Sequence, residues 1–144
     1  MTRAAAMALA AALAACAPAP DLGEKQPGQV GPVGPSQPFS TLVQEIIVPR
    51  CATASCHSGA FPQAYPPLDA DLAHGALVNA PSFQAPMDLV EPFDPANSYL
   101  VLKLRDVAGT VGSVGTPMPI GDALLEEADI QAIETWILNG APND

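Results

Sequence analysis

Residues 51–57 read CATASCH, and this stretch decides how the rest of the chain is interpreted. It places two thiols, those of Cys51 and Cys56, and the imidazole of His57 within one short loop. A group of this kind forms a disulfide, binds a metal or attaches a cofactor. The chain has three cysteines, an odd number that leaves one thiol over in an exported protein. The third, Cys16, therefore bears on what the pair does.

The N-terminal segment has the features of an export signal. Residues 1–15 contain one basic residue, Arg3, and no acidic residue, and they are rich in Ala, Leu and Met. The apolar run is shorter than the roughly 20 residues that span a bilayer. It ends in LAAC, which resembles the bacterial lipobox, and this resemblance implies that Cys16 is acylated. Ordinary cleavage near Ala17 or Ala19, or a plain anchor helix, are the alternatives.

A linker is predicted to follow the signal. Residues 16–38 alternate Pro with Gly and hold almost no large apolar side chains, so burial cannot offset the entropy lost on ordering. We expect a disordered tether between the lipid on Cys16 and a folded domain over residues 39–144. If Cys16 carries lipid, Cys51 and Cys56 remain as a pair in an oxidising compartment.

The thiol pair predicts covalent haem attachment in a variant form. In the standard motif C-x-x-C-H both thiols add to haem vinyl groups, and the adjacent His reaches the iron. Here four small residues separate Cys51 from Cys56, so the extra two have to bulge. The hypothesis is one haem c held by Cys51 and Cys56, with His57 as the proximal iron ligand. One alternative is a Cys51–Cys56 disulfide with His57 unused, in a binding or structural lipoprotein without haem. Another is zinc, which needs four ligands although His74 is the only other histidine.

Met118 is the candidate for the second axial position. It lies well downstream in the sequence TPMP, where a proline on each side restricts the backbone and holds the thioether in place. Ligation by His and Met raises the reduction potential of the iron. The alternative is that Met118 fills a gap in the core. His74 is the second choice for the distal ligand, and Met87 is the third.

A helix is predicted at the start of the folded part. Pro49 is expected to end it just before Cys51, and Ser40 or Thr41 is available to cap its start. Four apolar side chains share one helical face, namely Leu42, Val43, Ile46 and Ile47.

The strongest helical pattern is at the other end of the chain. Acidic residues near its start favour the positive end of a helix, and Gly140 followed by Pro142 is a typical stop. The apolar positions at helical spacing are Ile130, Ile133, Trp136 and Ile137.

Between these two helices the pattern predicts mostly loop. A short helix is possible within 71–78, and residues 98–104 favour a second one, with a buried strand as the alternative. Residues 109–121 form a Gly/Pro-rich loop around Met118. Loops of this length are expected to wrap around a core or a bound group.

The charge balance limits the choice of partners. The chain has 5 basic and 15 acidic residues, a net charge of −10 that becomes about −11 when Arg3 is removed with the signal. Such an excess argues against binding nucleic acid and against electrostatic attachment to anionic lipid. It favours a partner with a basic docking surface.

Residues 39–144 resemble the small class-I-type cytochrome c domains of exported bacterial lipoproteins, such as those of myxobacteria and planctomycetes. The matching pieces occur in the same order over nearly the whole domain: Ile47 to Cys51, Ser55 to Gly59, Leu68-Asp69, Leu77 to Asn79, Asn97 to Leu100, Met118-Pro119, Trp136-Ile137 and Gly140-Ala141. The resemblance implies an all-α domain with long loops wrapped round one haem, and His57 and Met118 as the iron ligands.

The implied function is electron transfer, so we expect a carrier and not an enzyme. Peroxidase-like activity of the haem is the alternative if Met118 does not bind the iron. A redox partner protein would dock on it, and the lipid on Cys16 would anchor it facing the periplasm. Ala17 after the lipid-bearing cysteine favours the outer membrane over the inner one. The domain is small and poor in aromatic residues, so we expect the form without haem to be poorly folded.

Overall fold

The computed structural model describes residues 35–113 and 115–144. The predicted signal peptide 1–15, the lipidation site Cys16 and the linker up to residue 34 lie outside these ranges. Contacts divide the chain into residues 1–30 and 31–144, and every described residue belongs to the second unit. Its elements are helices, and no strand forms in the described ranges, which confirms the all-α prediction. Within those ranges the β pairing amounts to the isolated bridges Val78–Val90 and Pro81–Asp88. None of the described helices is long and apolar enough to cross a membrane.

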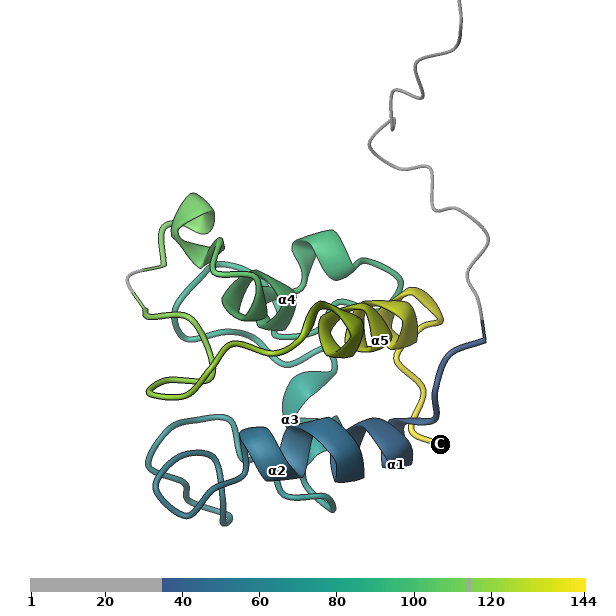
Figure 1. Ribbon diagram of the computed structural model, residues 1–144. Helices are drawn as coiled ribbons and strands as arrows, with labels where there is room; N and C mark the ends of the chain where they lie inside the picture. The colour runs from purple at the N-terminus through teal and green to yellow at the C-terminus, as the bar shows by residue number, and fades with distance from the viewer. Residues whose placement is uncertain (1–34, 114) are drawn as a thin grey trace, which may run out of the picture. The chain divides into compact units, whose positions relative to one another are not determined.

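The first helix is one rod made of three segments (Figure 1). These are α1 (Phe39–Leu42), the π-helical η1 (Val43–Ile47) and α2 (Val48–Arg50). The predicted caps Ser40 and Thr41 are wrong, because both lie inside the helix and no side chain caps α1 from its N-cap position. Asp144 satisfies free donors of the first turn instead: its Oδ1 accepts from Phe39 N at 2.8 Å and its backbone O from Ser40 N at 3.0 Å.

Pro49 does not end the first helix, which continues to Arg50. In an α-helix the Pro49 ring would clash with the carbonyl of residue 45, and the wider turns of η1 directly precede it. The helix ends where Ile47 O accepts from both Cys51 N, at 2.8 Å, and Ala52 N, at 3.2 Å. Cys51 is thus the residue at which this helix ends.

The middle of the chain contains four short helices joined by loops. They are α3 (Ala73–Leu77), the 3₁₀ helix η2 (Pro95–Asn97), α4 (Tyr99–Leu104) and the 3₁₀ helix η3 (Ala108–Val111). The structure confirms short helices near both predicted positions and rules out the strand alternative for 98–104. The predicted loop 109–121 begins inside η3, which is a small correction.

The last helix, α5 (Glu127–Leu138), matches its prediction closely. Its four predicted apolar positions are all buried, and Glu127 and Asp129 occupy its first turn. Gly140 has φ +93, and its N–H donates to Ile137 O at 2.9 Å. This closing turn needs a backbone conformation that favours glycine, which explains the stop there.

The first and last helices pack together through aromatic rings. The rings of Phe39 and Trp136 stack with their centroids 4.8 Å apart, and the imidazole of His74 meets the Phe39 ring edge-on at 5.2 Å. Trp136 Nε1 donates to Pro142 O at 2.9 Å. The contact between the two terminal helices belongs to the hydrophobic core.

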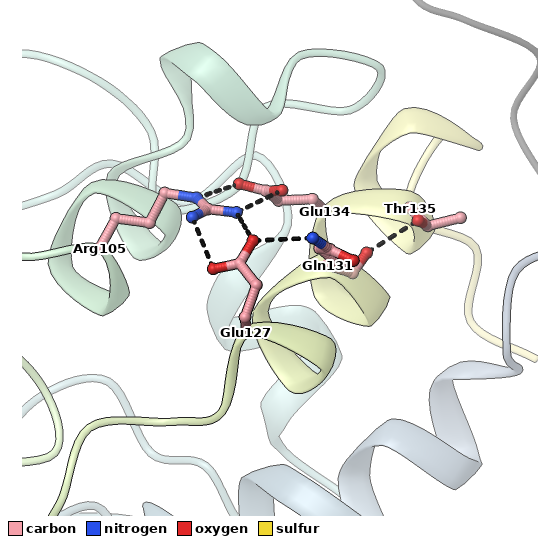
Figure 2. A network of polar contacts seen from close by, with 5 residues as sticks. All are labelled: Arg105, Glu127, Gln131, Glu134 and Thr135. Carbon is pink, nitrogen blue, oxygen red and sulfur yellow. Dashed lines mark hydrogen bonds and ion pairs between the residues drawn. The ribbon is translucent and has the colours of Figure 1, made fainter.

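An ionic network joins the end of α4 to α5 (Figure 2). The guanidinium of Arg105 donates to Glu134 Oε1 at 2.5 Å and Oε2 at 2.9 Å, and to both carboxylate oxygens of Glu127 at 3.0 and 3.1 Å. Arg105, and then Gln131, hold the pKa of Glu127 below its usual value through these hydrogen bonds. The network ties the C-terminal end of α4 to α5.

Candidate functional site

A cavity of about 770 Å³ lies between the loop that follows the first helix and helix α4. It falls within the usual range for cofactor sites, about 300 to 1,000 Å³. All four predicted site residues within the domain line it: Cys51, Cys56, His57 and Met118. Its other walls are largely aliphatic, from Leu68, Leu77, Leu89, Leu100 and Leu104.

The loop 51–57 folds back on itself. His57 N donates to Cys51 O at 3.3 Å, and Cys56 N donates to Thr53 O at 2.9 Å. These two bonds close the loop while Thr53, Ala54 and Ser55 are exposed. The extra residues therefore bulge, as predicted, and the imidazole returns to the neighbourhood of Cys51.

The imidazole of His57 is held in one orientation and one tautomer. The side chain is buried, and Nδ1 lies 2.7 Å from Pro66 O. A carbonyl oxygen only accepts hydrogen bonds, so Nδ1 carries the proton and donates it. The lone pair is then on Nε2, which makes no hydrogen bond within the described residues, while His57 lines the cavity. This is the arrangement that a metal-binding imidazole requires.

The two thiols are free and differ in acidity. Burial raises the pKa of Cys51 to about 11, although the positive charge of Arg50 opposes the rise. Hydrogen bonds from the side chains of Thr53 and Ser55 lower the pKa of Cys56. The alternative Cys51–Cys56 disulfide is absent from this part of the chain, which the structure describes in full.

Met118 reaches the cavity from a loop that is tied to α4. Its backbone N donates to Lys103 O at 3.2 Å, and its half-buried side chain packs against the core and lines the cavity. Some sixty residues of chain separate Met118 from His57. The fold therefore brings an imidazole and a thioether from distant segments to one apolar space.

The other candidate ligands lie elsewhere. His74 packs against Phe39 and Trp136, and its Nε2 donates to Ala141 O at 2.9 Å. Neither His74 nor Met87 lines the cavity. The described ranges hold no group of three or more His, Cys, Asp or Glu side chains that could bind a metal, so they offer no zinc site of the kind considered above.

The structure adds polar residues that sequence reasoning missed. Lys103 is 5% exposed and lines the cavity, and burial lowers its pKa against the opposing effect of Asp106. The Tyr99 hydroxyl donates to Gln84 Oε1 at 2.8 Å and so accepts from Ser113 Oγ at 2.5 Å. The sequence feature that could have indicated them is Lys103, which lies inside the apolar run 99–104 and four residues after Tyr99.

Arg50 is a second cation on the cavity wall. Its guanidinium donates to Ala123 O at 2.6 Å and lies 3.4 Å from Asp122 Oδ2. Its buried Nε has no hydrogen-bond partner in the described structure. Arg50 thus ties the end of the first helix to the loop that carries Met118.

Taken together, the cavity offers one nitrogen lone pair, one thioether and two thiols within an apolar wall. Comparisons with protein-family models, with curated proteins and with solved structures gave no match. The function is therefore argued from the chemistry of the cavity.

Proposed function

We propose that this chain is a mono-haem c-type cytochrome that carries electrons as an envelope lipoprotein. One observation carries the proposal: His57 and Met118 line the same cavity as the thiols of Cys51 and Cys56. Separate structural roles for the four residues would not require them to share one apolar space.

The donor set fits a haem. A covalently attached haem would need apolar walls and thiols for its attachment, and soft or borderline donors such as thioether and imidazole suit iron. The cavity supplies aliphatic walls, both thiols, a free Nε2 on His57 and the thioether of Met118. When bound, the haem supplies a one-electron couple whose potential His/Met ligation raises.

The chain's own residues orient the ligands. The bond from His57 Nδ1 to Pro66 O fixes the orientation of the ring and leaves Nε2 available as a ligand atom. Tertiary packing holds Met118 against the hydrophobic core. No proton transfer or nucleophile is needed, so the proposal is an electron carrier and not an enzyme.

The rim of the cavity offers a docking surface for a redox partner. Tyr65 is 52% exposed, Phe83 81% and Ile120 61%, and all three line the cavity. The rings of Tyr65 and Phe83 pair at 4.9 Å. Exposed apolar groups in such a cluster mark interaction sites, and the acidic chain favours a partner with basic residues around them. The lipid on Cys16 would hold the domain facing the periplasm, at the outer membrane in preference to the inner one.

The decisive experiment is expression with a cytochrome c maturation system. A haemochrome spectrum and the intact mass should show one covalent haem. The position of the spectrum also reports whether one or two thioether bonds form. A mass without haem, with Cys51 and Cys56 oxidised to each other, would reject the proposal.

The axial ligand is tested by replacing Met118→Ala. We expect the loaded protein to lose its low-spin spectrum and to show a lower reduction potential, because the soft thioether is gone. Met87→Ala is the matched control, since Met87 packs on the core outside the cavity and should leave the spectrum unchanged. An unchanged spectrum in Met118→Ala would show that another residue is the distal ligand.

A further inference from the structure

Lys103 is the buried charge that the proposed function does not use. Its side chain is 5% exposed although lysine is among the residues least often buried without a partner. No carboxylate pairs with it in the described ranges. An unpaired buried ammonium is costly, so the contacts that it does make are informative.

Those contacts lead to the loop that carries Met118. The Lys103 ammonium donates to Thr116 O, two residues before Met118, and the Lys103 backbone O accepts from Met118 N at 3.2 Å. One residue of α4 therefore holds the loop at two points, through its side chain and its main chain. The ammonium also lies 6.0 Å from the centroid of the Tyr99 ring, within range of a cation–π contact.

The loop is shaped to receive the ammonium. A Cβ added at Gly115 would lie 2.5 Å from Lys103 Nζ and 2.9 Å from Gln84 Oε1. Any larger residue at this position would push the ammonium away from Thr116. Gln84 is fixed in turn by the Tyr99 hydroxyl at 2.8 Å. Glycine at 115 and lysine at 103 thus form one fitted contact.

From these contacts we propose that Lys103 is a positioning residue for Met118, which keeps the thioether on the iron. This inference rests on the proposed haem site. The mechanism is restraint of the backbone on the N-terminal side of Met118, while Arg50 restrains the C-terminal side through Asp122 and Ala123. Lys103 itself does not bind the iron in this scheme.

The test uses the haem-loaded protein and imidazole as a competing ligand. Imidazole binds the oxidised iron only when Met118 leaves, so its apparent affinity reports how often the thioether is displaced. A hydrogen bond from a charged donor corresponds to about 10- to 100-fold in an equilibrium constant. Lys103→Met should therefore raise the apparent imidazole affinity by about 10- to 100-fold and weaken the far-red absorption of the Met–iron bond.

Two further variants separate positioning from general loss of stability. Gly115→Ala keeps the lysine but displaces its ammonium, so it should change imidazole affinity in the same direction. Arg105→Met is the matched control: it removes a cation just after the same helix and breaks contacts with α5, which do not touch the Met118 loop.

The outcomes distinguish this inference from the proposed function. No haem on the wild-type chain rejects both. A loaded wild-type protein with wild-type imidazole affinity in Lys103→Met and Gly115→Ala rejects the positioning role alone. So does an equal rise in Arg105→Met, because it would show that loss of stability and not the loop contact releases Met118.

Discussion

Removing the means of haem attachment should leave this domain without a stable fold. The perturbation is the double variant Cys51→Ala and Cys56→Ala, purified free of haem. The cavity of about 770 Å³ corresponds to about 18 kcal/mol at about 24 cal/mol per Å³ of cavity. This is an upper bound because water fills part of an open cavity. The several hundred Å² of apolar surface on a porphyrin gives a value on the order of 10 kcal/mol.

Both values are comparable to the whole stability of a domain, about 5 to 15 kcal/mol. The double variant should therefore have a free energy of unfolding near or below zero. Part of the helical signal in the far ultraviolet should persist in the double variant, so the side-chain signal is the better probe. Trp136 is the single tryptophan, it is 1% exposed, and it stacks on Phe39.

Near-ultraviolet circular dichroism of Trp136 is the assay, read alongside a urea titration. The loaded wild-type protein should give a strong signal and a cooperative transition. The double variant should lose the signal and unfold gradually. A cooperative transition in the double variant, with a free energy of unfolding above about 5 kcal/mol, would refute the reasoning and show that the helices alone hold the fold.

Two further predictions concern stability. Arg105→Met should cost about 1 kcal/mol because it removes the ion pair with the partly buried Glu134, as measured by urea unfolding of the loaded protein; the same variant also removes the contact with the exposed Glu127. Since Arg105 lowers the pKa of Glu127, the part of this stabilisation that comes from Glu127 is present above the ordinary glutamate pKa and is lost as the pH falls through the lowered one. The gap between the two proteins should therefore narrow in acid, and a constant gap would contradict an ionic contribution from Glu127. Gly140→Ala should cost about 1 to 2 kcal/mol, because φ is +93 and the new Cβ would lie 2.6 Å from Phe93 Cζ. Phe93 is 70% exposed and can move away from the new Cβ. The cost of the backbone strain should therefore remain when Gly140→Ala is added to Phe93→Ala. If thermal melting shows that Gly140→Ala does not lower the stability of Phe93→Ala, the cost comes from the Phe93 ring instead.

Local patterns made the helices predictable, but their ends depended on contacts. The spacing of Ile130, Ile133, Trp136 and Ile137 and the stop at Gly140 are properties of a short stretch, and α5 follows them. The start of the first helix was predicted wrongly. Its capping partner is Asp144, about a hundred residues away, and no local pattern indicates such a contact.

The sequence by itself determined the group of two thiols and one imidazole in residues 51–57. The tertiary structure decided which residues from other segments join this group around the cavity. CATASCH joins two thiols and an imidazole because they are neighbours in the chain, and its small residues allow the bulge. Only folding selects Met118 over Met87 and His74 for the cavity, places Pro66 O against His57 Nδ1, and buries Lys103 beside the Met118 loop. The reason is physical: a ligand's identity depends on distance in space, and segments far apart in the chain meet only when the hydrophobic core packs.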